Sequence, residues 1–91
     1  MKATIYSKDY CPFCVRAKAL LNKLGIPYDE FIISDSQDNA LEPHQQWASR
    51  EDLLALAPNA RTVPQIWLNN EHVGGYTELA ARFKDQTNLA A

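Results

Sequence analysis

The chain contains two cysteines, Cys11 and Cys14, with Pro12 and Phe13 between them. Cysteine thiolates attack disulfide bonds, and two thiols at this spacing can also form a disulfide with each other. Such a disulfide closes a very short loop, so it constrains the unfolded chain very little and adds little stability. The pair therefore indicates thiol–disulfide exchange rather than a crosslink that holds the fold together.

The neighbouring residues predict that the pair lies where a strand is followed by a helix. Residues 3–6 are prone to form a strand, and Pro12 suits the first turn of a helix. The first N–H groups of a helix have no partner within it, and the helix dipole adds positive charge there. We expect these groups and Lys8 to lower the pKa of the Cys11 thiol from about 8.5 into the range of roughly 3.5–7.5. Cys14 is one turn later and is expected to be more covered and less acidic.

Two other uses of the cysteines stay open. A Cys-x-x-Cys pair can be half of a zinc site, but such a site normally has four ligands. His44 and His72 are the other strong candidates, and the 28 positions between them do not match the spacing of a zinc motif. A purely structural pair is the remaining alternative.

The hydrophobic pattern predicts an α/β fold with the element order β-α-β-α-β-β-α. The first three elements form a βαβ unit, which implies two parallel strands and a right-handed crossover. Residues 34–48 are polar and acidic and give no clear pattern, although part of the segment is compatible with a helix. Residues 49–52 (SRED) resemble a capping signal for the second helix, and Asn69-Asn70 suits a tight hairpin turn. The expected strands cover residues 3–6, 28–33, 65–68 and 71–73, and the clearest helices cover residues 12–24 and 77–84.

Length and composition favour one small domain. The chain has 91 residues, of which 46% are hydrophobic and 22% charged, as in ordinary soluble globular proteins. No apolar run approaches the roughly 18 residues that a membrane span needs, and the N-terminal residues lack the apolar core of a secretory signal. We therefore expect a single domain over residues 1–91 in the cytoplasm, where thiols stay reduced, with no membrane partner.

Charge is unevenly distributed along the chain. Residues 1–23 carry a net charge of +4, residues 24–52 a net charge of −6, and the remainder is neutral. A pI near 5.5 gives no overall attraction to phosphate, so nucleic-acid binding is not expected. Both blocks can be solvated faces. Alternatively, the basic block surrounds the cysteines and favours anions and a thiolate there.

Three stretches of the chain resemble the dithiol glutaredoxins, a branch of the thioredoxin-fold superfamily. They are residues 6–14 (YSKDYCPFC), 62–65 (TVPQ) and 74–79 (GGYTEL), and they occur in the family's order and at compatible spacing. One of them alone would be weak evidence, whereas the three together are highly specific. The family's usual Tyr within the cysteine motif is Phe13 here, and residues 35–48 form a longer segment than is common in the family.

The resemblance implies a thioredoxin-like fold, in which a four-stranded mixed sheet is flanked by helices on both faces. It also implies that the Val63–Pro64 peptide bond is cis and faces the cysteine pair. Val63 can then offer its N–H and C=O groups to an extended peptide, as the edge of a sheet does. The alternative is that Pro64 merely begins an edge strand.

The resemblance further implies glutathione as co-substrate, with no tightly bound cofactor and no metal. Glutathione has two carboxylates, one ammonium and one thiol, so it needs two anion sites on either side of the sulfur. One site is expected at Lys8, with hydrogen bonds from Gln65. The other is expected at the start of the last helix, where Gly75 lets the ligand come close to the backbone. Glu78 would pair with the ammonium, and Phe13 would cover the sulfur. The residues implied to contact glutathione are Lys8, Phe13, Val63, Pro64, Gln65, Gly75, Thr77 and Glu78. The alternative for the charged and helix-capping residues among them is an ordinary surface or capping role.

In such a protein, Cys11 attacks the mixed disulfide between a protein and glutathione, and a second glutathione reduces the Cys11 adduct. Cys14 resolves the mixed disulfide that Cys11 forms with a protein disulfide. The implied partners are glutathione and glutathionylated or disulfide-containing proteins, with ribonucleotide reductase as a family candidate. The protein is expected to act as a monomer.

Two rival functions remain. One is an iron–sulfur carrier in which Cys11 and glutathione from two subunits ligate a cluster. Family members with that role usually lack a proline after the first cysteine, whereas Pro12 stands there in this chain. The other keeps the chemistry but takes electrons from thioredoxin reductase instead of glutathione.

Overall fold

The computed structural model describes residues 1–38 and 40–84, and the last seven residues of the expected domain, together with residue 39, lie outside the described residues. The elements follow one another as β1 (Ala3–Lys8), α1 (Pro12–Lys23), β2 (Tyr28–Ile33), β3 (Gln45–Ala48), α2 (Arg50–Leu56), β4 (Gln65–Leu68), β5 (Glu71–Gly74) and α3 (Tyr76–Arg82). Every expected element is present, and each begins or ends within a few residues of its expected position.

The strands form one mixed sheet in the order β3-β2-β1-β4-β5. β1 is parallel to β2, and β2 is parallel to β3, whereas β4 is antiparallel to both β1 and β5. This topology confirms the βαβ unit and the final hairpin, and it is a thioredoxin-like arrangement.

The prediction of four strands was wrong by one, because residues 45–48 form the edge strand β3. The polar composition of the segment hides this strand, since only Ala48 within it is buried. Its pairing is anchored by the Glu30 N–H, which donates to the His44 carbonyl at 2.8 Å. The Tyr28 and His44 rings also meet edge to face, with centroids 5.3 Å apart. Contacts to β2, rather than a hydrophobic pattern of its own, therefore define β3.

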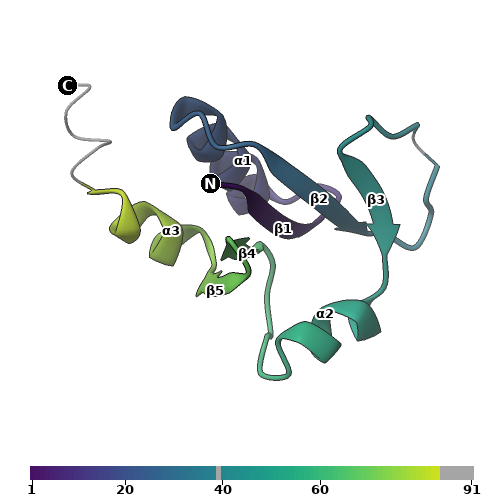
Figure 1. Ribbon diagram of the computed structural model, residues 1–91. Coiled ribbons are helices and arrows are strands. Elements are labelled where there is room, and N and C mark those ends of the chain that lie inside the picture. Colours follow the sequence, from purple (N-terminus) through teal and green to yellow (C-terminus); the bar gives the residue numbers. More distant parts are fainter. Residues whose placement is uncertain (39, 85–91) are drawn as a thin grey trace.

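Helices cover both faces of the sheet, and Figure 1 shows α1 and α2 on opposite sides of the strands. Two separate apolar clusters account for this arrangement. The first joins α1 and α3 to one face and contains Ala3, Ile5, Ala17, Leu20, Leu21, Ile26, Ile66, Leu68, Leu79 and Phe83. The second joins α2 and its connections to the other face and contains Tyr6, Ala48, Leu53, Ala57 and Trp67. Trp67 is thus a core residue, as its apolar strand predicts.

Local signals in the sequence explain where the helices and turns begin. Cys11 is the N-cap of α1, and Pro12 occupies its first turn. α2 begins with a capping box in which the Ser49 hydroxyl accepts from the Asp52 N–H while the Asp52 carboxylate accepts from the Ser49 N–H, both at 3.0 Å. The hairpin turns through Asn69, with φ 49°, and its neighbour Asn70, with φ 72°, as the two asparagines predict. Across residues 1–38 and 40–84, every helix is too short or too polar to cross a membrane.

Candidate active site

The two cysteines form a disulfide at the junction of β1 and α1. Their Cα atoms are 5.2 Å apart, which one helical turn provides without rearrangement of the backbone. The Cys11 sulfur accepts a hydrogen bond from the Cys14 N–H at 3.2 Å, so an N–H group of the first helical turn points at this sulfur. Cys11 retains 7% of its exposure and Cys14 only 1%, which confirms that Cys14 is the more covered of the two.

The Val63–Pro64 peptide bond is cis and lies next to Cys11. The Cys11 sulfur is 3.8 Å from the Val63 carbonyl oxygen, although 52 positions separate the two residues in the sequence. The backbone before β4 is therefore close enough to contact whatever is bound to this sulfur. Both expectations for this dipeptide, the cis bond and its position facing the cysteines, are confirmed.

A groove of about 310 Å³ runs beside this dipeptide, and we call it the Phe13 groove. It brings together six of the residues implied to contact glutathione, from three distant parts of the chain. Its lining consists of Phe13, Thr62, Val63, Pro64, Gly75, Tyr76, Thr77 and Glu78. The Phe13 ring is half exposed; the Tyr76 ring centroid lies 6.2 Å away, and the Arg16 guanidinium lies 5.2 Å from the Phe13 ring centroid.

The Gly74-Gly75 step keeps the groove open at the start of α3. Gly74 has φ +122°, a conformation that other residues rarely adopt, and a Cβ there would lie 2.9 Å from Glu78 Oε1. A Cβ on Gly75 would lie 3.3 Å from both the Pro64 carbonyl and Glu78 Oε1. Glu78 itself accepts the Gly75 N–H at 2.7 Å, so its carboxylate fixes the entrance to α3.

The other two expected contact residues lie outside the Phe13 groove. Lys8 lies in neighbouring grooves, one of which also contains both cysteines. Gln65 is 8% exposed, and its amide NH₂ donates to the Thr62 carbonyl at 2.9 Å. Its amide oxygen lies 2.8 Å from His72 Nε2, and the His72 ring stacks on Trp67 with centroids 4.7 Å apart. The Gln65 side chain thus secures the turn that precedes the cis peptide bond.

The structure shows a part for His72 that sequence reasoning missed. The Gln65 amide NH₂ donates to the Thr62 carbonyl, so the Gln65 amide oxygen faces His72. An amide oxygen can only accept, so His72 Nε2 is the donor in this hydrogen bond. The signal available in the sequence was the hairpin, which brings His72 opposite Trp67 in the next strand. The hairpin was expected, but its register was not, so the contact could not be anticipated.

A second groove, of about 350 Å³, contains both cysteines, and we call it the Cys14 groove. Lys8 and Lys18, two residues of the basic block, line it together with Asp9. Glu30 also lines it and is 98% buried, although it was expected only as part of an acidic block.

Burial alone would raise the pKa of Glu30. Hydrogen bonds from Ser7, Gln45 and Lys18, and the charge of Lys18, outweigh burial and hold this pKa below its ordinary value. The carboxylate is therefore charged at neutral pH.

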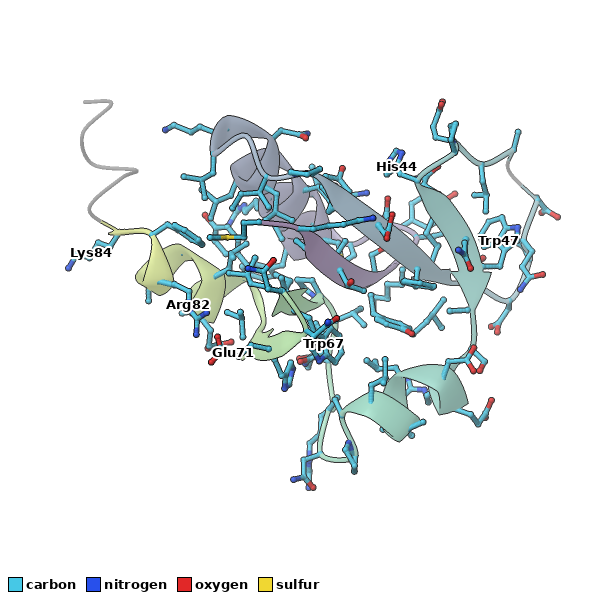
Figure 2. All side chains as sticks on the ribbon, in the orientation of Figure 1. His44, Trp47, Trp67, Glu71, Arg82 and Lys84 are labelled. Carbon is cyan, nitrogen blue, oxygen red and sulfur yellow. A yellow bond between two sulfur atoms is a disulfide. The ribbon has the colours of Figure 1, made fainter. Side chains whose placement is uncertain are left out.

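A zinc site is the first alternative use of the cysteine pair. Within residues 1–38 and 40–84, no group of three or more His, Cys, Asp or Glu side chains is placed to hold a metal ion. Arg82 and Glu71 form an ion pair at 2.9 Å on the surface between α3 and β5 (Figure 2).

Known proteins share both the sequence and the fold of this chain. The family model described as Glutaredoxin matches residues 3–73. Glutaredoxin 1 of Escherichia coli (strain K12) is 37% identical over 86 residues, which cover 93% of this chain and 95% of that protein.

Solved structures agree with the sequence matches. The crystal structure of glutaredoxin 1 from Francisella tularensis complexed with cacodylate superposes with a TM-score of 0.70 at 33% identity, covering 96% of each chain. The crystal structure of a buckwheat glutaredoxin–glutathione complex superposes with a TM-score of 0.63 at 28% identity, covering 92% of this chain and 69% of that one. With a cysteine pair at the start of α1, a cis proline beside it and this degree of similarity, the chain belongs to the glutaredoxin family.

Proposed function

We propose that Cys11 is the nucleophile and Cys14 the resolving thiol of this glutathione-dependent thiol–disulfide oxidoreductase. The family assigns the reaction class, and the placement of Cys11 supports the division of roles. Its sulfur caps α1, accepts an N–H from that helix and is the more exposed of the two sulfurs. The single observation that carries the proposal is this position of Cys11, between the start of a helix and the Val63 backbone.

With a glutathionylated protein, the Cys11 thiolate attacks the glutathione sulfur. The protein's sulfur leaves as a thiolate and takes a proton from water, and Cys11 becomes disulfide-bonded to glutathione. The thiolate of a second glutathione then attacks the sulfur of the first. Oxidised glutathione departs, and the Cys11 thiolate is restored. Electrons balance, because two glutathione sulfurs end as one disulfide and one protein thiol is released.

With a protein disulfide, Cys11 forms a mixed disulfide with the protein and one protein thiol leaves. Cys14 then attacks the Cys11 sulfur, releases the second protein thiol and leaves Cys11 and Cys14 joined. This is the bond seen in the structure. One glutathione thiolate attacks the Cys11 sulfur and releases the Cys14 thiolate, and a second glutathione then displaces the Cys11 thiolate as oxidised glutathione departs.

A low pKa at Cys11 favours its release more than its attack. Lowering a thiol pKa from about 8.5 to about 5 raises the thiolate fraction at pH 7 about 30-fold, while the intrinsic nucleophilicity falls by a similar factor. As a leaving group, the same thiolate departs faster. The helix N–H groups therefore serve the step in which glutathione displaces Cys11 from a disulfide.

We assign the Phe13 groove to the glutathione part of the mixed disulfide. The exposed Phe13 ring would cover the sulfur, and the Val63 N–H and C=O would pair with the peptide backbone. The unpaired N–H groups at the start of α3, with Thr77, would hold the γ-glutamyl carboxylate, and Glu78 would attract the ammonium. Support comes from the lining of the groove, which gathers these residues beside Pro64.

Lys8 and Gln65 are proposed to act from outside this groove. Lys8 supplies positive charge toward the glycyl carboxylate, while Gln65 supports the ligand by holding the Thr62 carbonyl in place. The other proposals follow from the family alone. The whole chain would form one domain, and the protein would act as a cytoplasmic monomer without a tightly bound cofactor. Its protein substrates would be glutathionylated or disulfide-containing proteins, ribonucleotide reductase among the candidates.

A coupled assay with a low-molecular-weight mixed disulfide of glutathione tests the electron source. The protein is expected to consume NADPH with glutathione and glutathione reductase, and to show no turnover with thioredoxin reductase alone. Turnover with thioredoxin reductase alone would contradict the proposed function.

A further inference from the structure

Glu30 is the one charged side chain that is buried among residues 1–38 and 40–84. Its Oε2 accepts the Ser7 hydroxyl at 2.6 Å and the Lys18 ammonium at 2.9 Å, and its Oε1 accepts the Gln45 amide at 2.9 Å. These four residues, from β1, α1, β2 and β3, form the Glu30 cluster. Replacing a buried ion pair by apolar residues is often neutral or stabilising, so stability alone does not explain why a charge is kept here.

The Glu30 cluster lies beside the reactive cysteines. Glu30, Lys18 and Gln45 line the Cys14 groove together with Cys11 and Cys14. Lys18 follows Cys14 by four positions on α1, so both side chains lie on the same side of that helix. The Cys14 groove shares no lining residue with the Phe13 groove. The cluster thus lines the redox site outside the Phe13 groove, on a side where Lys8 is the one proposed glutathione contact.

We propose that Lys18 and Glu30 are positioning residues whose opposite charges set the redox equilibrium of the Cys11–Cys14 pair. The proposal rests on thiol–disulfide exchange by this pair, which the family establishes, and it does not depend on where glutathione binds. Glu30 holds the Lys18 ammonium in the groove, and each charge offsets the other's effect on the sulfurs.

The argument follows from the charge that reduction creates. The disulfide is neutral, whereas the reduced pair carries a thiolate. The Lys18 ammonium stabilises the thiolate and therefore the reduced state. The Glu30 carboxylate repels the thiolate and therefore destabilises the reduced state. Lys18 keeps 27% of its side-chain exposure while Glu30 keeps 2%, so solvent screens the carboxylate less. The other charged groups of the groove, Lys8 and Asp9, are unchanged in the variants below.

Equilibration with a dithiothreitol redox buffer at pH 7 tests the proposal without glutathione. Dithiothreitol gives two electrons and becomes a cyclic disulfide, while the bond between Cys11 and Cys14 breaks. Two protons pass to the protein sulfurs, and the more acidic thiol returns its proton to water. The measured quantity is the equilibrium constant for reduction, read from the fraction of protein with alkylatable thiols.

The two single variants are expected to shift this constant in opposite directions. Lys18→Met keeps the carboxylate but removes the ammonium, and it should lower the equilibrium constant for reduction about tenfold. Glu30→Gln keeps the ammonium but removes the carboxylate, and it should raise this constant about tenfold. A tenfold change corresponds to about 30 mV for this two-electron couple. The double variant should return to within about threefold of the parent, and Lys18→Arg, which keeps the charge, should behave as the parent does.

Matched controls change the same charges away from the groove. Lys23→Met lies in the last turn of α1 and Glu51→Gln in the first turn of α2, both on exposed side chains, and neither should move the constant. If Lys18→Met does not fold, as judged by circular dichroism, Lys18→Gln replaces it. Shifts of the two single variants in the same direction, or shifts no larger than those of the controls, would overturn the proposal. Loss of activity with glutathione while the opposite shifts persist would instead count against the proposed function alone.

Discussion

At the scale of single residues, the chemistry depends on which of two sulfurs can be reached and released. Cys11 caps a helix and touches the Val63 carbonyl, whereas Cys14 is enclosed in the first turn of that helix. Both residues could be identified from Cys-Pro-Phe-Cys, because the spacing and Pro12 predict the start of a helix, and Cys11 is indeed the N-cap of α1. Their order of action stays a prediction.

Substitution of each cysteine should separate the two reactions. Cys11→Ser removes the nucleophile and should abolish turnover of both kinds of substrate, a loss of at least about 10³-fold. Cys14→Ser should keep most of the activity toward glutathionylated substrates, which needs one sulfur, and lose reduction of protein disulfides. Steady-state rates with one substrate of each kind measure this. An equal loss of both activities in both variants would contradict the assigned roles.

Gly75→Ala should weaken binding in the Phe13 groove without unfolding the protein. The new Cβ would lie 3.3 Å from the Pro64 carbonyl and from Glu78 Oε1, so it crowds the groove where no backbone strain is expected. We expect KM for a glutathione mixed disulfide to rise about tenfold, or ~1.4 kcal/mol.

Gly25→Ala is the matched control for this change. Gly25 has φ +71° and nothing within 4 Å of an added Cβ, so the substitution should cost about 1–2 kcal/mol of stability and leave KM unchanged. The assignment of the groove would be wrong if both alanine variants had the same KM as the parent.

Residue types alone could not place Gln65. The TVPQ stretch indicates that this residue is near the site, but the structure turns its amide toward Thr62 and His72. Which side of a strand a glutamine faces depends on the pairing register, and one residue of register reverses the face.

At the scale of elements, the sequence is most informative where local chemistry forces a boundary. The Ser49 cap and the Asn69-Asn70 turn could both be predicted, because each depends on the conformation and hydrogen bonds of residues close by in the sequence. β3 could not be predicted, because its pairing depends on the hydrogen bonds that Gln45 and His44 make to Glu30 rather than on a hydrophobic pattern within the strand.

Removal of the capping box should destabilise α2 and leave the chemistry intact. Ser49→Ala takes away the acceptor of the Asp52 N–H and should lower the free energy of unfolding by about 1 kcal/mol, as measured by urea denaturation. Ser36→Ala, at an exposed serine outside any helix, is the control and should change it by less than about 0.5 kcal/mol. Equal effects of the two substitutions would show that the cap contributes nothing.

At the scale of the whole molecule, one buried carboxylate joins three strands and a helix. Glu30 contacts β1, α1 and β3 from its place in β2. No pattern in the sequence could show this, since burial of a charge is favourable only when all its partners arrive together. The first apolar cluster, by contrast, follows largely from helical and strand periodicity, as Ala17, Leu20 and Leu21 of α1 show.

Acid should destabilise the molecule through Glu30. Its pKa is lower in the folded state than its ordinary value of 4.5, so the unfolded chain binds more protons as the pH falls below that value. The stabilisation is complete above pH 4.5 and is lost as the pH decreases through the lower pKa of the folded state. Urea denaturation between pH 7 and pH 3 should show this fall, and Glu30→Gln should flatten it.

Asp29→Asn is the control for this pH dependence, because Asp29 is adjacent in the chain but pairs with Lys2 on the surface. It should leave the slope with pH nearly unchanged. A slope that is as steep in Glu30→Gln as in the parent would exclude Glu30 as its origin.

The most direct test of the whole account is the pKa of the Cys11 thiol in the reduced protein. It is measured as the pH dependence of iodoacetamide alkylation at Cys11 in the Cys14→Ser variant, with the modified residue identified by mass spectrometry. The account predicts a midpoint in the range of roughly 3.5–7.5 and rapid alkylation at neutral pH. A midpoint near 8.5, the value of an ordinary thiol, would contradict the claim that the start of α1 holds this sulfur as an anion.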